Sequence, residues 1–585
     1  MHIAVIGSGG REAALALRLR AEGNTTAQFA APTGDLASFC GELQALCIEL
    51  AVIGPEAPLA AGLADALRSV GVATVGPGQG AAQLEASKSW AKGFMARHGV
   101  ATAPWRAMAV HQAELEAPTC PLPVVVKRDG LCGGKGVSVC RTPAELVAAL
   151  QQAHDRDGPH ALVVLEHLLV GRELSLHALV SDGQCVLLPA AMDHKRLFDQ
   201  DLGPNTGGMG AVAPLPWCTP QLLADIESEV IAPTLRGLQA ENIGYRGVLY
   251  FGLMLTRHGP RLLEYNVRFG DPECQVLLPL IATNLANLLM AVARGELRDQ
   301  PIAVQPGFAA AVVLAAPGYP HAPQLGTIID IPSIQDLSLA GMQATAAGWQ
   351  TCAGRVATAV GQGPSLDLAL KQAYCRAEPL AAQGLLLRRD IGAKAKPARV
   401  AVLASGRGSN LAALIAASSH GILQGLAQIE LALFDRGAPG QSVARAAGIA
   451  THQLDSTGIS PEQWAQCALP LLHQYGIEVV VLAGFARILA STLIAAYPAR
   501  ILNIHPADPV HYVGLHGYRW AFAQQLPATT ITVHLVDAGL DSGPILAQEG
   551  VDLRGAQSLA QVEARGLQVE HRLYPQTLRN FLLEH

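Results

Sequence analysis

The sequence predicts an α/β fold in two parts, a multidomain first half and a single-domain second half. Strand-like apolar runs alternate with Ala- and Leu-rich helical stretches along almost the whole chain, which is the pattern of α/β proteins. The 585 residues are too many for one hydrophobic core. The short basic segment 393–397 is followed by a new strand, glycine loop and helix, so we place the boundary between the halves there.

Composition and charge exclude several classes of protein. Apolar residues make up 50% and charged residues 15%, which is enough apolar surface to bury cores and argues against intrinsic disorder. The net charge of −6 argues against nucleic acid as a main partner. No apolar run reaches the ~18 residues of a membrane helix, and the N-terminus lacks the features of a signal peptide. The 11 cysteines include no C-x-x-C pair, so we expect reduced thiols and a cytoplasmic protein.

Apolar runs bounded by glycine, proline or charged residues mark the expected strands of the first half. They lie at residues 1–7, 50–54, 72–75, 121–127, 137–140, 161–166, 174–180, 248–255 and 261–267. Beyond residue 300 the composition changes, and strands at 310–316 and 354–360 indicate a smaller module. The expected domains, with the linker included, cover residues 1–95, 96–300, 301–393, 394–398 and 399–585.

The first glycine turn, GSGGRE at residues 7–12, follows a strand and opens a helix. Backbone N–H groups at such a turn bind phosphate or other anions, so Gly9, Gly10 and Arg11 are candidate substrate ligands. Position 12 is Glu, so the G-x-G-x-x-G pattern of a dinucleotide site is absent. A tight turn without any ligand is an equal alternative.

A second glycine loop, residues 127–136, carries Lys127 at the end of a strand and Lys135 within the loop. Two ammonium groups beside a glycine loop suit the phosphates of a nucleotide. The spacing differs from that of a Walker A loop, and a hairpin with solvated lysines is the alternative.

Glu264 and Asn266 lie two residues apart on an expected strand, so their side chains share one face. A carboxylate and an amide oxygen are hard ligands suited to Mg²⁺. Arg268 and further charged residues follow directly. The alternative is an ion-pair network at the end of the strand.

Asp193 and Lys195 belong to the charged segment DHKR, and a glycine-rich run follows at residues 203–210. We expect this run to be a loop because it is too rich in glycine for regular structure. Both segments suit closure over an anionic substrate, and a simple linker is the alternative.

Residues 1–395 resemble the phosphoribosylamine–glycine ligases, an ATP-grasp family, in which these motifs occur in the same order. The matching segments are GSGGRE, VIGPEAPL, GAAQLEASK, VVKRDGLCGGKGV, DHKR, GPNTGGMGA and LLEYNVRFGDPE. The resemblance implies that glycine and 5-phosphoribosylamine are joined at the cost of ATP, through glycyl phosphate. The implied ATP ligands are Lys88, Lys127, Lys135, Glu166 and Glu173. The implied Mg²⁺ or Mn²⁺ ligands are Glu264 and Asn266, and the implied substrate ligands are Gly9, Gly10, Arg11, Asp193, Lys195 and Arg268.

Two departures from the family pattern lie in the N-terminal domain. Position 13 is Ala where the family has His, and residues 31–39 replace a P-G-N-A-G segment. Both concern binding of the acceptor amine more than the chemistry of ATP.

The second half carries a third glycine turn and three polar residues at expected strand ends. Gly408, Ser409 and Asn410 form an anion cradle between a strand and a helix. Asn503 and His505 share one face of a strand, because side chains alternate with a period of two. Asn can donate to a developing oxyanion and His can move a proton near neutral pH. Asp541, in GLDSGP, can orient the His; the alternative is that His505 is a hydrogen-bonded core residue.

Residues 398–585 resemble glycinamide ribonucleotide formyltransferases, which have a Rossmann-like fold. The matching segments are SGRGSNL, VVVLAGFARIL, LNIHP, YVGLH and TVHLVDAGLDSGP. The resemblance implies Asn503, His505 and Asp541 as the catalytic set and Gly408, Ser409 and Asn410 as phosphate ligands. It places 10-formyltetrahydrofolate near Arg487, Ile488 and Leu489. The loop 507–510 departs from the family pattern. This departure bears on the affinity for the formyl donor or on the choice of acceptor, more than on the class of reaction.

The product of the first reaction is the substrate of the second, so we expect a bifunctional ligase and formyltransferase of purine biosynthesis. One alternative is that the same two chemistries serve a different amino acid or amine in a specialised pathway. Another is that one half is inactive and acts as a scaffold. We expect small-molecule substrates, no nucleic-acid or membrane partner, and we leave open whether the chain forms a homodimer.

Overall fold

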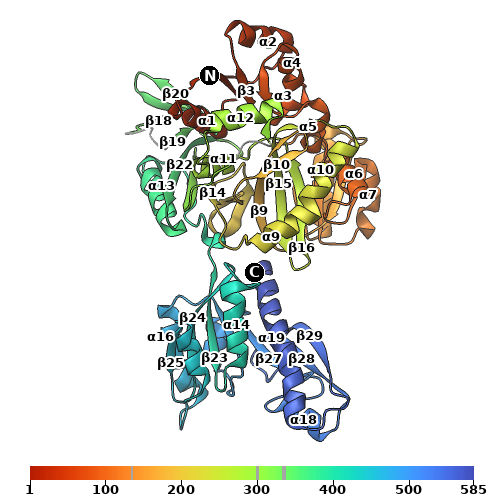
Figure 1. Ribbon diagram of the computed structural model, residues 1–585, viewed down its shortest axis with the longest axis vertical. Helices are drawn as coiled ribbons and strands as arrows, with labels where there is room; N and C mark the ends of the chain where they lie inside the picture. Colours follow the sequence, from red (N-terminus) through yellow and green to blue (C-terminus); the bar gives the residue numbers. More distant parts are fainter. Residues whose placement is uncertain (134–135, 298–301, 332–336) are drawn as a thin grey trace. The chain divides into compact units, whose positions relative to one another are not determined.

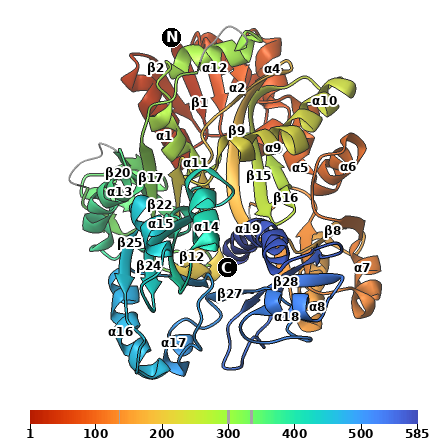
Figure 2. The same ribbon diagram turned by 60° about the horizontal axis from the view of Figure 1, so that its bottom comes forward.

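The computed structural model describes residues 1–133, 136–297, 302–331 and 337–585 (Figures 1 and 2). The chain divides into two compact units, Met1–Ala395 and Lys396–His585. Sheets and helices alternate along both units, which confirms the predicted α/β class.

The first unit begins with a parallel four-stranded sheet in the order β2-β1-β3-β4. Its strands are β1 (His2–Ile6), β2 (Thr25–Phe29), β3 (Leu50–Ile53) and β4 (Ala73–Val75). The accompanying helices are α1 (Gly10–Ala21), α2 (Leu36–Ala45), α3 (Glu56–Ala60), α4 (Leu63–Ser69), α5 (Gln79–Ala86) and α6 (Lys88–His98). Sequence patterns missed β2, because its TTAQF sequence is only partly buried and carries no apolar run.

Two antiparallel sheets follow. The first, in the order β5-β8-β6-β7, contains β5 (Trp105–Ala109), β6 (Val124–Arg128), β7 (Val137–Cys140) and β8 (Leu162–His167), with α7 (Val110–Glu116) and α8 (Pro143–Asp157). The second, in the order β10-β9-β15-β16, contains β9 (Arg172–Ser181), β10 (Gln184–Leu187), β15 (Arg246–Thr256) and β16 (Gly259–Asn266). The helices of this region are α9 (Pro220–Ile226), η3 (Glu227–Ile231), α10 (Ala232–Ala240), α11 (Glu273–Leu277) and α12 (Leu285–Arg294).

A five-stranded sheet links the central region to the last module of this unit. Its order is β11-β14-β17-β22-β19, with β11 (Met192–Asp193), β14 (Gly210–Ala213), β17 (Phe308–Ala315), β19 (Leu337–Leu339) and β22 (Arg355–Gly363). Helix α13 (Leu366–Ala381) packs on β17 and β22. Two small sheets are formed by β12 (Arg196–Phe198) with β13 (Leu202–Asn205), and by β18 (Ile328–Ile329), β21 (Gly348–Thr351) and β20 (Met342–Thr345).

The glycine-rich run 203–210 is not the continuous loop that we predicted. Leu202–Asn205 pairs with Arg196–Phe198, and Gly210 begins β14. Gly203, the second residue of β13, takes a φ of +80°, a left-handed conformation that glycine adopts without strain, where the pairing with β12 is irregular.

The second unit is built on one seven-stranded sheet in the order β25-β24-β23-β26-β27-β28-β29. The first five strands are parallel and the last two antiparallel: β23 (Ala398–Ala404), β24 (Ala427–Phe434), β25 (Ala450–Gln453), β26 (Val479–Leu482), β27 (Ile501–His505), β28 (Ala528–Leu535) and β29 (Ile545–Asp552). The helices are α14 (Ser409–His420), α15 (Gly440–Ala446), α16 (Pro461–Gln474), α17 (Ser491–Ala496), α18 (Gly517–Ala523) and α19 (Leu559–Glu584).

Alternation along β23 distributes its side chains between two cores on opposite faces of this sheet. Val400 and Val402 belong to the core covered by α14 and α19, which lie side by side in Figure 1. Ala401 and Leu403 belong to the other core, which contains Trp464 of α16. The strand order reverses between β23 and β26, and ligands of such sheets bind at the carboxyl ends of strands beside this switch point.

Two expectations from composition can be compared with the structure. All 11 cysteines are free thiols. Within the described ranges, no helix is both long enough and apolar enough to cross a membrane.

Candidate active sites of the two units

The first glycine turn is built around the buried carboxylate of Glu12. This carboxylate accepts the Gly9 N–H at 2.8 Å and pairs with Arg11 Nη2 at 2.6 Å. Arg11 Nη1 also donates to the carbonyl of Phe269 at 2.7 Å. Two of the three predicted anion ligands, Gly9 and Arg11, therefore have internal partners in this structure. The third, Gly10, is the first residue of α1.

Replacing Gly54 by Ala is expected to destabilise the first unit by about 2–4 kcal/mol. A Cβ at position 54 would lie 1.8 Å from Glu12 Oε1, so the buried carboxylate would have to leave the Gly9 N–H. Gly80→Ala is the control, because nothing lies within 4 Å of that added atom and Gly80 is in α5. Thermal unfolding should show a lowered midpoint temperature for Gly54→Ala only. Equal midpoints for Gly54→Ala and Gly80→Ala would contradict the expectation.

Asp271 lies beside this turn, where a Cβ added at Gly9 or Gly10 would be 3.5 Å from its carboxylate, and it connects three parts of the first unit. Its carboxylate accepts Gln275 Nε2 at 2.9 Å and pairs with Arg355 Nη2 at 3.1 Å. Burial opposes its ionisation, but Arg355 and Arg11 hold its pKa below the usual value. Arg355 Nη1 also donates to the carbonyl of Gly207 at 2.7 Å. Sequence spacing gives no signal for these contacts, because the partners of Arg355 come from distant segments of the chain.

The lysines predicted to meet ATP already have polar partners. Lys88 Nζ donates to the carbonyl of Gly130 at 2.8 Å, which joins α6 to the glycine loop. Lys127 Nζ donates to the carbonyl of Leu263 at 2.9 Å and pairs with Glu166 at 3.1 Å. Glu166 and Lys127, predicted on different motifs, are thus brought together. Lys135 lies outside the described residues.

Glu173 and Lys195 form an ion pair of 2.5 Å beside Asp193. Burial raises the pKa of Asp193 to about 7, with Lys195 opposing the shift and the carboxylates of Glu273 and Glu173 adding to it. Burial likewise opposes the charge of Lys195, yet Asp193 and Glu173 raise its pKa well above the usual value. The predicted substrate ligands Asp193 and Lys195 therefore form one charged cluster with the predicted nucleotide ligand Glu173.

Glu264 and Asn266 are suited to a divalent cation. The register of β15 and β16 shifts at Leu263, and beyond the shift Glu264 and Asn266 alternate regularly opposite Gly252 and Tyr250. In the part of the chain that the structure describes, neither side chain has a hydrogen-bond partner. Burial opposes the ionisation of Glu264, but the neighbouring Lys127 and Lys195 lower its pKa, so it is a carboxylate at neutral pH. These uncommitted hard oxygens on one face fit Mg²⁺ or Mn²⁺.

Arg268 is held by two acids rather than lying free. Its Nη2 donates to Glu85 Oε1 at 2.9 Å, and its Nε lies 3.4 Å from Glu56 Oε2. Burial opposes its charge, but these two carboxylates raise its pKa above the usual value. Arg268 therefore joins α3 and α5 to the end of β16.

In the second unit, the glycine turn after β23 opens at the switch point. Gly408 has a φ of +82°, and a Cβ there would lie 2.8 Å from the Cα of Gly440, so two loops meet closely. Asn410 Nδ2 donates to Glu570 Oε2 at 2.5 Å, and Tyr518 also donates to Glu570. The Asn410 amide group is thus committed to a buried acid of α19, which sequence patterns did not single out, while Ser409 is partly exposed.

Asn503, His505 and Asp541 lie together as predicted, with His534 as a fourth member. Asn503 Nδ2 lies 3.3 Å from Asp541 Oδ1 and 3.1 Å from His534 Nε2. His505 Nδ1 lies 3.6 Å from Asp541 Oδ2, and its Nε2 lies 2.9 Å from the carbonyl of Tyr512. Asn503 and His534 are directly opposite in the antiparallel pair of β27 and β28. A His within the apolar strand TITVHLV was the available signal for His534.

The stability of the second unit is expected to depend on the ionisation of Asp541. Burial raises the pKa of Asp541, but His534, the Gly514 N–H and His505 together lower it below the usual value. The folded-state pKa is thus below the unfolded one, so this stabilisation is full above about pH 4 and is lost as pH falls through the folded value. Asp541→Asn should cost more stability at pH 7 than at pH 3. Urea unfolding, followed by proteolysis and mass spectrometry of second-unit peptides, tests this; an equal cost at both pH values would contradict it.

The three residues predicted near the folate lie after β26. Arg487 donates to the carbonyls of Ser456 and Ile459 at 2.7 and 2.9 Å, so its side chain anchors a neighbouring loop. Ile488 is 67% exposed, whereas Leu489 is buried. Arg487 and Leu489 thus hold the segment, and Ile488 is the side chain free to contact a ligand.

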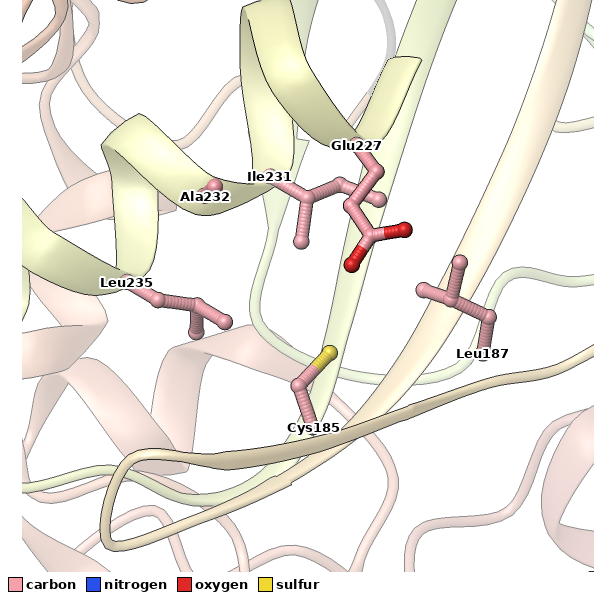
Figure 3. Close-up of a pocket in the computed structure, with 6 residues that line it drawn as sticks. All are labelled: Cys185, Leu187, Glu227, Ile231, Ala232 and Leu235. Carbon is pink, nitrogen blue, oxygen red and sulfur yellow. The ribbon is translucent and has the colours of Figure 1, made fainter. Parts of the chain in front are cut away.

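A small pocket in the first unit contains none of the predicted site residues (Figure 3). It is lined by Cys185, Leu187, Glu227, Ile231, Ala232 and Leu235. Burial, with a smaller contribution from Glu227, raises the pKa of the Cys185 thiol to about 12. This thiol is therefore protonated at neutral pH and is not a nucleophile.

Family models match almost the whole chain. The N, ATP-grasp (A) and C domains of phosphoribosylglycinamide synthetase match residues 1–85, 86–274 and 309–394. The formyl transferase model matches residues 398–578.

Individual proteins agree with these matches. A phosphoribosylamine–glycine ligase of Chlorobaculum tepidum is 40% identical, over 68% of this chain and 100% of its own length. The trifunctional purine biosynthetic protein adenosine-3 of Gallus gallus is 38% identical, over 70% of this chain and 43% of its own length. The crystal structure of a phosphoribosylamine–glycine ligase from Thermotoga maritima is 32% identical, with a TM-score of 0.58, and covers 67% of this chain and 100% of its own.

Proposed function

We propose that this chain, which belongs to the phosphoribosylamine–glycine ligase family and carries a formyl transferase domain after it, catalyses two consecutive steps of purine biosynthesis. The first unit joins glycine to 5-phosphoribosylamine with ATP and yields glycinamide ribonucleotide. The second unit transfers a formyl group from 10-formyltetrahydrofolate to that product. The match of the first unit to ligases over their full length, joined in one chain to a formyl transferase match, carries this proposal.

In the first unit, charge stabilisation and positioning account for the ligation. Lys88 and Lys127 would meet the phosphates of ATP, and Glu264 and Asn266 would hold Mg²⁺ or Mn²⁺. The cation, when bound, neutralises charge on the transferring phosphoryl group. The glycine carboxylate attacks the γ-phosphorus and ADP leaves; the amine of 5-phosphoribosylamine then attacks the resulting acyl phosphate and inorganic phosphate leaves.

Asp193, Lys195 and Arg268 would orient the two acceptors beside these groups. Gly10 and its neighbours in the first turn would supply N–H groups to the phosphate of 5-phosphoribosylamine. The adenosine of ATP would lie toward Glu166 and Glu173. These assignments are supported by the contact of Glu166 on β8 with Lys127 on β6, and by the charged cluster of Glu173 on β9 with Asp193 and Lys195.

In the second unit, the substrate amine attacks the formyl carbon and a tetrahedral oxyanion forms. His505 Nδ1 is 3.6 Å from Asp541, beyond hydrogen-bond distance, and its Nε2 faces the carbonyl of Tyr512. The protonated ring can therefore donate from Nδ1 toward the oxyanion, and Asp541 would stabilise that cation. Asn503, fixed by His534 and Asp541, orients the attacking amine. The proton of the amine passes to the departing nitrogen of the folate. Gly408, Ser409 and, through its backbone N–H, Asn410 would bind the substrate phosphate.

One reaction mixture tests both activities. It contains the protein, Mg-ATP, glycine, phosphoribosylamine generated in situ and 10-formyltetrahydrofolate, and its products are identified by mass spectrometry. We expect formylglycinamide ribonucleotide, and glycinamide ribonucleotide when the folate is omitted. ATP consumption without these products would contradict the substrate assignment and would support another amino acid or amine.

Small molecules are the substrates of both units. We further propose a cytoplasmic location, supported by 11 free thiols, which suit a reducing compartment. Nucleic acid and membranes are not proposed as partners. Light scattering of the purified chain would establish whether it forms a homodimer.

A further inference from the structure

A buried triad of charges in the first unit contains one lysine to which no role has been given above. Lys92 on α6 and Lys127 on β6 contact different oxygens of Glu166 on β8, at 3.0 and 3.1 Å. The side chains of Lys92 and Glu166 are each only 3% exposed. Each lysine therefore occupies one oxygen of a carboxylate that has little access to water.

Lys92 is also anchored by groups outside the triad. Its Nζ donates to Thr102 Oγ1 at 2.6 Å, and this hydroxyl donates to the carbonyl of Leu262, also at 2.6 Å. Burial lowers the pKa of Lys92 to about 8, and Glu166 opposes that shift, so Lys92 is still mostly protonated at neutral pH. Lys92 is thus a fixed cation that faces Glu166.

The freedom of the Lys127 ammonium group to contact a ligand depends on how tightly Glu166 holds it. Lys127 also donates to the carbonyl of Leu263, on the strand that carries Glu264. Without Lys92, the whole carboxylate of Glu166 would be available to Lys127. Attraction between opposite charges is strong in a poorly hydrated interior, so the ammonium group of Lys127 would pair more tightly with Glu166 and be drawn toward β8.

We propose that Lys92 is a positioning residue of the ligase unit, which occupies one oxygen of Glu166 and so leaves the ammonium group of Lys127 available to the triphosphate of ATP. This inference rests on the proposed function, because the contact between Lys127 and the triphosphate belongs to it. Lys92 touches no substrate and acts only through Glu166.

Calorimetric titration of the full-length protein with two ligands tests this role. The Mg²⁺ complex of adenylyl imidodiphosphate carries the triphosphate group, whereas adenosine does not. Lys92→Met leaves Glu166, the residue placed toward adenosine, charged and paired with Lys127. The variant should therefore weaken binding of the triphosphate analogue by about tenfold and change adenosine binding by less than about twofold. Arg97→Met is the matched control, because Arg97 lies on the same helix and pairs with Glu241 at the surface. It should change neither affinity.

A second variant distinguishes positioning from a general loss of structure. When Glu166→Gln is added to Lys92→Met, Lys127 has no carboxylate to hold it, and about fivefold of the triphosphate affinity should return. If Lys92→Met alone does not fold, Glu166→Gln is compared with the double variant. In that background, removal of Lys92 should change triphosphate binding by less than about twofold.

Four outcomes would overturn the inference. Equal losses for adenosine and the triphosphate analogue would mean that Lys92 only supports the fold. Losses from Lys92→Met and Glu166→Gln that multiply in the double variant would exclude action through Glu166. If Lys127→Met weakens binding of the triphosphate analogue and Lys92→Met leaves it unchanged, this inference is overturned and the proposed function is not. Unchanged binding in Lys127→Met would overturn the proposed nucleotide contact, and this inference with it.

Discussion

Replacing His505 by Ala is expected to lower kcat for formyl transfer by about 10³-fold, while ligation in the same chain is unchanged. His505 is 4% exposed and lies between Asp541 and the carbonyl of Tyr512. Its removal therefore deletes the group that we propose faces the developing oxyanion, and it leaves the Asp541 carboxylate without one of its two histidines. Single-turnover measurement with glycinamide ribonucleotide and 10-formyltetrahydrofolate gives the rate of the chemical step.

His511→Ala is the matched control for this variant. His511 is exposed in the loop that follows β27, so its loss should leave formyl transfer within about twofold. His534→Ala should have an intermediate effect, because Asn503 Nδ2 loses one of its two partners. Retention of full formyl transfer by His505→Ala would show that the residue is a core histidine. A parallel loss of ligation would point to misfolding.

The Glu264→Gln variant is expected to lower ligation by at least about 10²-fold without affecting formyl transfer. The substitution keeps the shape of the side chain but removes the charge that would hold Mg²⁺ or Mn²⁺ beside the phosphates. It also leaves Lys127 and Lys195 without the carboxylate that they help to ionise. The measurement is glycine-dependent ADP release at increasing Mg²⁺ concentration, where the variant should require more metal than the wild type.

Glu229→Gln controls for loss of an acid near the same strand. Glu229 forms a surface ion pair of 2.8 Å with Arg261, at the other end of β16, and its removal should change ligation by less than about twofold. Asn266→Ala should resemble Glu264→Gln, because both side chains offer oxygen to the same cation. Unchanged metal dependence in Glu264→Gln would exclude this pair as the metal site.

Local patterns accounted for the fold class and for pairs of residues that are close in sequence. Alternation with a period of two placed Asn503 beside His505 on β27 and Glu264 beside Asn266 on β16. The glycine turns follow β1 and β23 and open α1 and α14 as predicted. Apolar runs identified many of the buried strands, but the partly exposed β2 and the short buried β14 escaped notice.

Other features depended on contacts that no spacing predicts. Arg11 and Asn410 were predicted to face anionic ligands, but both hold internal partners, Phe269 and Glu570, that lie far away in the chain. His534 lies opposite Asn503 only because of the register between β27 and β28.

The sequence alone therefore established which chemical groups the protein carries and in what order, since strands, turns and helices follow from neighbouring residues. Only the tertiary structure decided which of these groups are already engaged with one another. The triad of Lys92, Lys127 and Glu166 is the clearest case, because three separate elements must pack together before its charges meet. Burial then makes each charge depend on the others, and no single segment contains that information.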